Sequence, residues 1–399
     1  MKRKGLNSVQ TKTSNRLLVL QLLCMMGGGS RTELTKRTRL AKMTVSNITA
    51  ELLQNGVLYE KEPLENENQG AGRKQMLLSF SEHAPAVIGV WLSRDSCMGI
   101  AAAVDLEVLQ QRTIPLEEGE TAASLLSKLE DLCAFLRDSV SGKREVVGVG
   151  IASIGPLDIR QGVLLNPPNF YGIQDIPIGE ELEKRLGLPV FLENDTNAGA
   201  LAEKYFGQCT DCTDFVYVGL TNGLSMGIVL RDSLLHGRHG FAGEAGHTTI
   251  DPMGAVCYCG RRGCLETVCT VPALMKAANE ELDCRCADFE QLCGLCARSG
   301  QAADWILTKL GPLTEALANV SNILDPEKII MGHEGALLPQ GILQAVEKGV
   351  NEKILAGKQA YISVERSSFG ALAAVYGAAA VVLKKVFDGQ AGYSLFFGE

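Results

Sequence analysis

The strongest constraint on the fold of this chain is a glycine-rich segment that carries four potential metal ligands. From Gly243 to Glu266 the sequence runs GEAGHTTIDPMGAVCYCGRRGCLE. The four ligands are His247, Cys257, Cys259 and Cys264. Three thiolates and one imidazole satisfy tetrahedral zinc, and the intervening glycines let the backbone turn tightly around the ion. Because the protein fills all four positions, none is left for an activated water, and the segment predicts a structural zinc site.

The remaining cysteines are expected to have no metal. Cys284, Cys286, Cys293 and Cys296 have a superficially similar spacing, but residues 288–298 have a helical pattern, so Cys293 and Cys296 are expected to pack as small hydrophobes. A second zinc site is the weaker alternative. We interpret Cys209 and Cys212 as incidental residues of a polar turn.

Length and cysteine usage indicate a cytoplasmic protein of more than one domain. A chain of 399 residues can form two or three cores. Its thirteen cysteines are clustered, unlike those of a secreted disulfide framework. No uninterrupted apolar run reaches the roughly 18 residues of a membrane helix, and the basic N-terminus is not followed by a cleavage site. We therefore expect no membrane association.

Charge is distributed unevenly along the chain. Residues 1–80 contain 13 Lys and Arg against 6 Asp and Glu, a net charge of +7, whereas the remainder contains 25 against 40. A basic N-terminal region on an acidic body suggests a module that binds a polyanion. A solvated, basic helix pair would give the same charge, so the pattern of residues has to decide.

Three helices are predicted in the basic region. The first covers residues 14–26 and ends at a run of three glycines. Ser30, with Glu33 three residues later, predicts the start of a second helix over 31–37. After a short break a third helix is expected over 42–54. In this helix Val45, Ile48 and Leu52 share one apolar face.

The opposite face of the third helix is polar. It presents Lys42, Thr44, Ser46 and Asn47. Small polar side chains near the N-terminus of a helix can reach base edges in the major groove of DNA, so this helix is predicted to be a recognition helix. The alternative is a three-helix packing unit without a ligand. Arg39 and Ala41 weaken the interpretation, because such turns often carry Gly and a capping Ser at these two positions.

A β-hairpin is predicted to follow the helices. Residues 57–60 and 73–78 form its strands, and residues 66–72 form a polar tip. Arg73 and Lys74 at its edge suit phosphate or minor-groove contact. The hairpin would be the wing of a winged helix-turn-helix over residues 1–80, followed by a second domain over 84–399.

Over nearly its whole length, the chain resembles the regulator branch of the ROK family, which groups repressors, open reading frames and sugar kinases. The resemblance rests on the zinc segment and on the stretch LENDTNAGALAE at residues 192–203. Supporting patterns lie at 148–158, 168–172, 324–335 and 370–380. It implies an α/β fold, a two-lobed actin-like domain with a ligand cleft between the lobes. Strand-like runs at 146–151 and 215–220 alternate with helical stretches, in agreement with that fold.

The resemblance also implies a set of sugar-binding residues. In the family's kinases, sugar hydroxyls are held by residues that match Asn194, Asp195, Glu244, His247 and Glu266, and Gly155 and Asn169 match further positions near the sugar. The residue that matches Asp195 is also the base that deprotonates the attacking hydroxyl. Carboxylates and amides suit this role because they form directional bonds to vicinal hydroxyls. A helix cap at Asp195 and ordinary surface acids are the alternative.

The phosphate-binding loops of those kinases are not matched. Their first loop reads Asp-x-Gly-Gly-Thr, whereas residues 91–95 here read WLSRD, and the Asp95 carboxylate would repel a triphosphate. Their second loop, Gly-Thr-Gly-x-Gly-Gly-Gly, is TNGLSMG at 221–227. Near the adenosine end only Gly332 and Gly335 remain. The sequence therefore predicts sugar binding without phosphorylation.

The leading hypothesis is a transcriptional regulator, a repressor, that binds operator DNA as a homodimer or a dimer of dimers. A sugar or sugar phosphate would be its effector and would change operator affinity. Two alternatives stay open: an ATP-dependent ROK sugar kinase with a DNA-binding extension, and a regulator controlled by a protein partner.

Overall fold

The computed structural model describes residues 8–62, 76–282, 284–357 and 359–398. Its contacts divide the chain into two compact units. Unit 1 comprises residues 1–193 and 378–399, and unit 2 comprises residues 194–377. Each unit contains one five-stranded sheet with its own apolar core.

Unit 1 begins with the three predicted helices. They are α1 (Ser8–Met26), α2 (Arg31–Thr38) and α3 (Lys42–Gln54). A small sheet in the order β1-β3-β2 follows, with β1 at Gly29–Ser30, β2 at Leu58–Lys61 and β3 at Leu77–Phe80. The first helix starts six residues earlier than predicted, at Ser8, and β1 was not predicted at all. The predicted hairpin tip, Arg73 and Lys74 lie outside the described residues.

Local chemistry explains the ends of these elements. The Ser30 hydroxyl accepts a hydrogen bond from the Glu33 amide at 3.2 Å and so caps α2, as predicted. Arg39, in place of the usual glycine, ends α2 in the left-handed region with φ 57°. Gly28 has φ 119°, and a Cβ there would lie 2.3 Å from the carbonyl oxygen of Leu78, so β1 reaches β3 only with glycine at this position.

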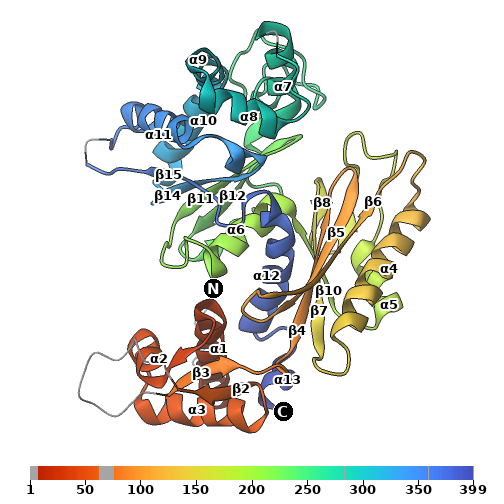
Figure 1. Ribbon diagram of the computed structural model, residues 1–399, viewed down its shortest axis with the longest axis vertical. Coiled ribbons are helices and arrows are strands. Elements are labelled where there is room, and N and C mark those ends of the chain that lie inside the picture. The colour runs from red at the N-terminus through yellow and green to blue at the C-terminus, as the bar shows by residue number, and fades with distance from the viewer. Residues whose placement is uncertain (1–7, 63–75, 283, 358, 399) are drawn as a thin grey trace. The chain divides into compact units, whose positions relative to one another are not determined.

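The large sheet of unit 1 has the order β10-β7-β4-β5-β6. Its strands are β4 (Ala86–Leu92), β5 (Ser96–Ala103), β6 (Val108–Pro115), β7 (Val146–Ser153) and β10 (Val190–Asn194). Strands β4, β5 and β6 form an antiparallel meander, and β7 pairs with β4 in parallel. Helices α4 (Ala122–Val140) and α5 (Ile178–Leu186) cover one face (Figure 1). A small hairpin of β8 (Leu157–Asp158) and β9 (Val163–Leu164) follows β7.

The sheet of unit 2 has the order β13-β12-β11-β14-β15. Its strands are β11 (Phe215–Leu220), β12 (Leu224–Leu230), β13 (Ser233–Leu234), β14 (Lys328–His333) and β15 (Ser363–Arg366). Helix α6 (Asp195–Phe206) packs on β11 and β12. The other helices are α7 (Val271–Glu281), α8 (Phe289–Arg298), α9 (Gly300–Lys309), α10 (Gly311–Leu324) and α11 (Gln340–Lys353).

The cysteines outside the zinc segment lie in apolar surroundings. Cys293 and Cys296 on α8 are buried in the core of unit 2, as predicted. Cys209 and Cys212 do occupy a turn, but their side chains are also buried, against Phe215 and Tyr217. Their interpretation as residues of a polar turn was therefore incomplete, because the turn folds its thiols inward.

The last two helices are α12 (Ala373–Phe387) and α13 (Tyr393–Phe397). Gly150 of β7 lets α12 approach closely, since a Cβ there would lie 1.9 Å from the Ala378 carbonyl oxygen. The stretch Gly370–Phe387 has the length and hydropathy of a membrane span, but 67% of it is buried inside the protein. Burial of this kind is typical of a core helix.

Helix α13 contacts the N-terminal helices through a buried arginine. Arg16 of α1 donates to Glu51 of α3 at 2.7 Å and to the Tyr393 hydroxyl at 2.9 Å. Its guanidinium also lies 5.2 Å from the centre of the Phe397 ring. The Asn55 side chain at the end of α3 donates to the Phe396 carbonyl at 3.0 Å. The C-terminal helix therefore packs directly on the predicted recognition helix.

Candidate functional site

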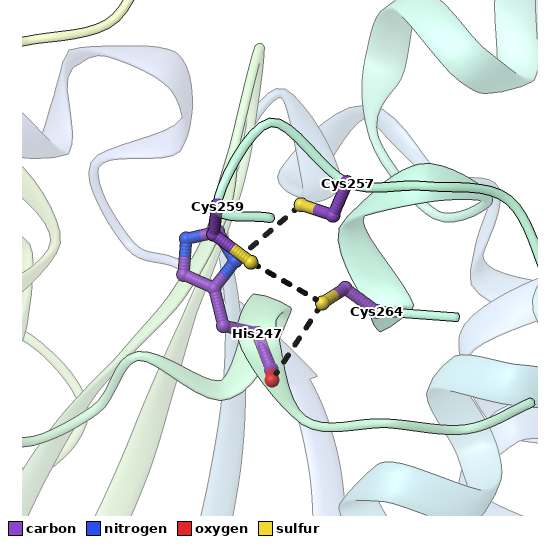
Figure 2. Close-up of side chains that lie close together, drawn as sticks. All are labelled: His247, Cys257, Cys259 and Cys264. Atoms are coloured by element: carbon purple, nitrogen blue, oxygen red, sulfur yellow. Dashed lines mark hydrogen bonds between the residues drawn. The ribbon is translucent and has the colours of Figure 1, made fainter. Parts of the chain in front are cut away.

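The four predicted metal ligands converge in unit 2. One donor atom from each of His247, Cys257, Cys259 and Cys264 lies within 4.8 Å of all the others (Figure 2). The Cys259 and Cys264 sulfurs are 3.7 Å apart, and the Cys257 sulfur is 3.7 Å from His247 Nδ1. A zinc tetrahedron with bonds of about 2.3 Å to sulfur requires S···S edges of roughly 3.8 Å. The donor set and its spacing therefore fit zinc, in agreement with the structural site that the sequence predicts.

The loop that carries the ligands has almost no regular secondary structure. An isolated bridge joins Thr249 to Cys264, and the Cys257 amide donates to the Arg261 carbonyl at 2.8 Å. Gly263 has φ 66°, and a Cβ there would lie 1.5 Å from the Asp251 carbonyl oxygen. Arg261 donates to the His247 carbonyl at 3.1 Å. Tight turns and few apolar contacts are typical of a loop whose order depends on its metal.

Three predicted sugar-binding carboxylates, those of Asp195, Glu244 and Glu266, lie near His247 of this cluster, itself a predicted sugar-binding residue. The pKa of the Glu244 carboxyl is raised because the surrounding chain removes water from it, and because Glu266 and Asp195 add negative charge nearby, against the opposing effect of His247. All four residues belong to unit 2. A concentration of carboxylates beside an imidazole suits recognition of a polyhydroxylated ligand.

Asn194 has a structural task at the same position. Its side-chain oxygen caps α6 by accepting the amides of Thr196 at 3.0 Å and Asn197 at 3.2 Å. Asp195 is the first residue of that helix and accepts the Thr196 amide at 2.7 Å. The cap that the sequence analysis considered for Asp195 is therefore supplied mainly by Asn194. The helix N-terminus fixes both side chains at the start of α6.

Gly155 and Asn169 lie in unit 1 and are described separately. Gly155 follows β7 and precedes a cis peptide bond to Pro156. Asn169 is exposed, in a loop after β9, with φ 55°. The structure places neither in the unit that holds the other predicted sugar-binding residues.

The two turns that the sequence predicts in place of the phosphate loops each contain an internal hydrogen bond. Between β4 and β5 the Asp95 carboxylate accepts the Ser93 hydroxyl at 2.6 Å, and Arg94 donates to the Pro168 carbonyl. Between β11 and β12 the Thr221 amide donates to the Gly223 carbonyl at 2.9 Å. Amides and side chains that bond one another in this way are occupied, whereas a phosphate loop presents its amides to the ligand.

The residue at the end of β14 is a fully buried histidine. His333 Nδ1 lies 3.2 Å from the Tyr217 hydroxyl, and burial lowers the pKa of His333 to about 4. Gly332 is required because a Cβ there would lie 1.9 Å from the Tyr217 ring. The Tyr217 and His333 rings therefore pack into the core around the glycines that the sequence analysis identified at this end.

The predicted DNA-binding residues of α3 lie as expected from the helical pattern. Val45, Ile48 and Leu52 are buried, whereas Lys42 and Asn47 are exposed and Thr44 and Ser46 are half-buried. Arg31 of α2 links helix α3 to strand β2 through hydrogen bonds. This side chain donates to Thr49 at 3.0 Å and to Glu60 of β2 at 2.5 Å. The polar face of α3 is therefore presented on a rigid support.

Three residues that contribute to these two regions were not identified from the sequence. Arg16 and Thr49 are buried polar residues of the helical region. Tyr258 lies between two metal ligands in the sequence, and its hydroxyl is 3.0 Å from His247 Nε2. Its position in the Cys-x-Cys motif was the one available signal, whereas nothing in the helical pattern marked Arg16 or Thr49.

The comparisons with known proteins agree with this combination of elements. The model of the ROK family matches residues 87–385. The xylose repressor of Caldicellulosiruptor bescii is 30% identical, covering 96% of this chain and 98% of the relative. The crystal structure of a ROK family transcriptional regulator, a homologue of the Escherichia coli Mlc protein, superposes with a TM-score of 0.78 at 29% identity, covering 95% of this chain and 98% of that one.

A kinase structure matches a smaller part of the chain. The ROK hexokinase from Thermus thermophilus has a TM-score of 0.64 at 28% identity, and the match covers 76% of this chain and all of the hexokinase. The two-sheet fold and the His/Cys cluster thus define a sugar-kinase-like protein with an N-terminal helical extension. The chain belongs to the ROK family, and to its transcriptional regulators in particular. The cluster is typical of the zinc site of this family.

Proposed function

We propose that this protein is a cytoplasmic, DNA-binding repressor whose ROK domain binds a sugar or sugar derivative without phosphorylating it. The observation that carries the proposal is the pairing of a polar α3 face on a rigid support with a cluster of Asp195, Glu244, His247 and Glu266 beside the metal ligands. Relatives over nearly the full chain are named xylose repressor and N-acetylglucosamine repressor.

The domain division supports the same function. The family match covers residues 87–385, so the proposed winged helix-turn-helix of residues 1–80 lies outside the matched part, and the proposed sensor of residues 84–399 contains it. In this proposal Lys42, Thr44, Ser46 and Asn47 contact operator DNA, and Arg73 and Lys74 of the wing contact phosphates. Operator recognition by two such modules requires a homodimer or a dimer of dimers.

The four-ligand cluster would hold zinc and so order the effector loop, and the effector contacts Asn194, Asp195, Glu244, His247 and Glu266. The ion supplies structure and no chemistry of its own, because the protein provides all four ligands. The turns at 93–95 and 221–223 bond internally, which supports binding without phosphoryl transfer.

Fluorescence anisotropy tests this function. The full-length protein is titrated onto a labelled fragment from upstream of its own gene, with and without D-xylose, D-glucose, N-acetyl-D-glucosamine or the two hexose 6-phosphates. We expect specific binding with a steep salt dependence, and release of the fragment by one of the sugars. Binding without a response to any of these ligands would favour control by a protein partner.

Variants assign the roles within that experiment. Asp195→Asn removes a charge-assisted bond of about 1.5–3 kcal/mol, so the effector should bind roughly ten- to a hundredfold more weakly, while effector-free DNA binding is kept. Asn47→Ala should weaken the specific fragment more than random DNA, and Lys74→Ala should weaken both alike. Equal losses in the last two variants would contradict the assigned division between base and phosphate contacts.

A further inference from the structure

The hydroxyl of Tyr258 occupies the side of His247 that faces away from the metal ligands. His247 Nδ1 is directed at the Cys257 sulfur, at 3.7 Å, and Nε2 lies 3.0 Å from the Tyr258 hydroxyl. When Nδ1 binds a metal ion, the ring proton resides on Nε2, which then donates. Tyr258 therefore accepts the one hydrogen bond that His247 has left to offer.

The same hydroxyl interacts with the neighbouring carboxylates. The pKa of Tyr258 is raised because the loop partly withdraws its hydroxyl from water and because Glu266 and Glu244 add negative charge nearby. Because its oxygen accepts the imidazole proton and lies in the field of two carboxylates, the phenol occupies the position that an alcohol group of a ligand would take on His247.

The backbone of Tyr258 is constrained by its neighbours, whereas its side chain is largely exposed. Cys257 and Cys259, its two chain neighbours, are both predicted metal ligands, so the metal fixes the backbone on either side. The side chain is 62% exposed, and its ring packs edge-on against His247 with centroids 5.2 Å apart. The ring can therefore rotate away without disturbing the apolar core.

We propose that Tyr258 is an internal substitute for an effector hydroxyl: it occupies His247 Nε2 in the effector-free protein and is displaced when a sugar binds. This inference rests on the proposed sugar-sensing function of the same site. It makes Tyr258 a residue that sets the effector threshold, because each sugar has to break a phenol hydrogen bond before it forms its own. Direct contact of the phenol with bound sugar is the opposing possibility.

Calorimetry on the zinc-loaded, full-length protein distinguishes these two roles. Wild type and Tyr258→Phe are titrated with D-xylose, D-glucose, N-acetyl-D-glucosamine and the two hexose 6-phosphates. The phenylalanine ring keeps the edge-on contact and removes only the hydroxyl. We expect the variant to bind the effector about three- to tenfold more tightly, the value of one hydrogen bond that no longer has to be broken.

Tyr361→Phe is the matched control. Tyr361 is also an exposed tyrosine of unit 2 whose hydroxyl bonds to a carboxylate, Glu347 Oε1 at 2.5 Å, and its loss should leave effector affinity unchanged. Zinc content is measured in all three proteins and should be equal.

Each outcome separates the inference from the function on which it rests. Tighter binding by Tyr258→Phe, or binding by that variant alone, supports displacement. If wild type binds a sugar and Tyr258→Phe binds it equally or more weakly, the displacement role is wrong although sugar sensing stands. If neither protein binds any of the five ligands, the proposed sugar-sensing function fails, and the inference fails with it.

Discussion

The two large sheets of this protein share one topology and differ in what their connections carry. In each, three consecutive strands form an antiparallel meander whose first strand pairs in parallel with a later strand: β4 with β7 in unit 1, β11 with β14 in unit 2. The predicted DNA-binding helices precede β4, whereas the loop with the predicted metal ligands follows β13. The repeated sheet is thus a frame, and the distinct functions lie in the segments attached to it.

The corresponding ends of the parallel strands also differ. Strand β7 ends at Ser153, a buried serine whose hydroxyl donates to the Ile154 carbonyl at 3.2 Å. Strand β14 ends at His333, a buried histidine beside Tyr217. A neutral serine and a titratable imidazole at matched positions give the two sheets different responses to pH.

The largest difference between the units should appear when the metal loop is broken. Cys264→Ser removes one of four ligands, so we expect zinc content to fall from one ion per chain to near zero. The loop of unit 2 should then lose order, because structural zinc contributes on the order of 10 kcal/mol to the folding of small sites. Elemental analysis and hydrogen exchange measure the two effects.

Cys269→Ser is the control for that variant. Cys269 is an equally buried cysteine five residues away that lies outside the ligand cluster. It should retain zinc. Full zinc occupancy in Cys264→Ser would contradict the four-ligand site. If the variant raised hydrogen exchange in unit 1 as strongly as in unit 2, the two units would not have independent roles.

A smaller difference is expected on acidification. Since burial lowers the pKa of His333 from 6.5 to about 4, the unfolded chain binds a proton in this range that the folded protein excludes. Stability should therefore fall as the pH drops from 6.5 to 4, by up to about 3 kcal/mol from this residue. Urea unfolding of wild type and His333→Asn at several pH values isolates the contribution.

The variant should show a flatter pH dependence even if its absolute stability changes. Ser153→Ala serves as the matched change in the sheet of unit 1 and should keep the wild-type slope. An unchanged slope in His333→Asn would show that other groups account for the acid sensitivity.

The N-terminal helical region, which precedes β4, should make a smaller contribution to stability. Arg16→Met leaves Glu51 and Tyr393 without their shared donor, and because the Glu51 side chain is one-third exposed we expect a loss of about 2 kcal/mol. Urea unfolding should show this loss, together with weaker DNA binding. Lys384→Met breaks an exposed pair with Asp388 and should cost about 0.5 kcal/mol or less. Equal losses of stability in Arg16→Met and Lys384→Met would show that the buried Arg16 contributes no more than an exposed ion pair.

The smallest effect is expected from MgATP, at the first turn of each meander, between β4 and β5 and between β11 and β12. Because residues 93–95 and 221–223 bond internally, saturating MgATP should leave the melting temperature unchanged. Differential scanning fluorimetry with and without MgATP measures this, and a sugar effector is the positive control. A clear rise with MgATP would revive the kinase alternative.

The sequence was most informative where chemistry or periodicity is local. The ligand spacing from His247 to Cys264 identified the metal cluster, and the 3.6-residue pattern of Val45, Ile48 and Leu52 identified the buried face of α3. Both depend on neighbours within a few turns of chain. The family resemblance then supplied the two-sheet fold, which no local pattern determines.

Contacts between distant segments were not accessible from the sequence. Arg16 appeared to be one more basic residue of a charged region, yet it is buried by Tyr393 and Phe397, some 377 residues away in the chain. Strand β1 was missed because two residues beside a glycine run carry no alternating pattern and exist as a strand only through pairing with β3. Tertiary partners decide such positions.

The packing of α13 on α1 and α3 has a consequence for the order in which the chain is made. A ribosome releases the N-terminal helices long before residues 393–397 exist, so during synthesis Arg16 and Asn55 have no partners from α13. We therefore expect the predicted recognition helix to be less stable in a nascent or prematurely terminated chain than in the finished one. Such incomplete products should then compete poorly for the operator.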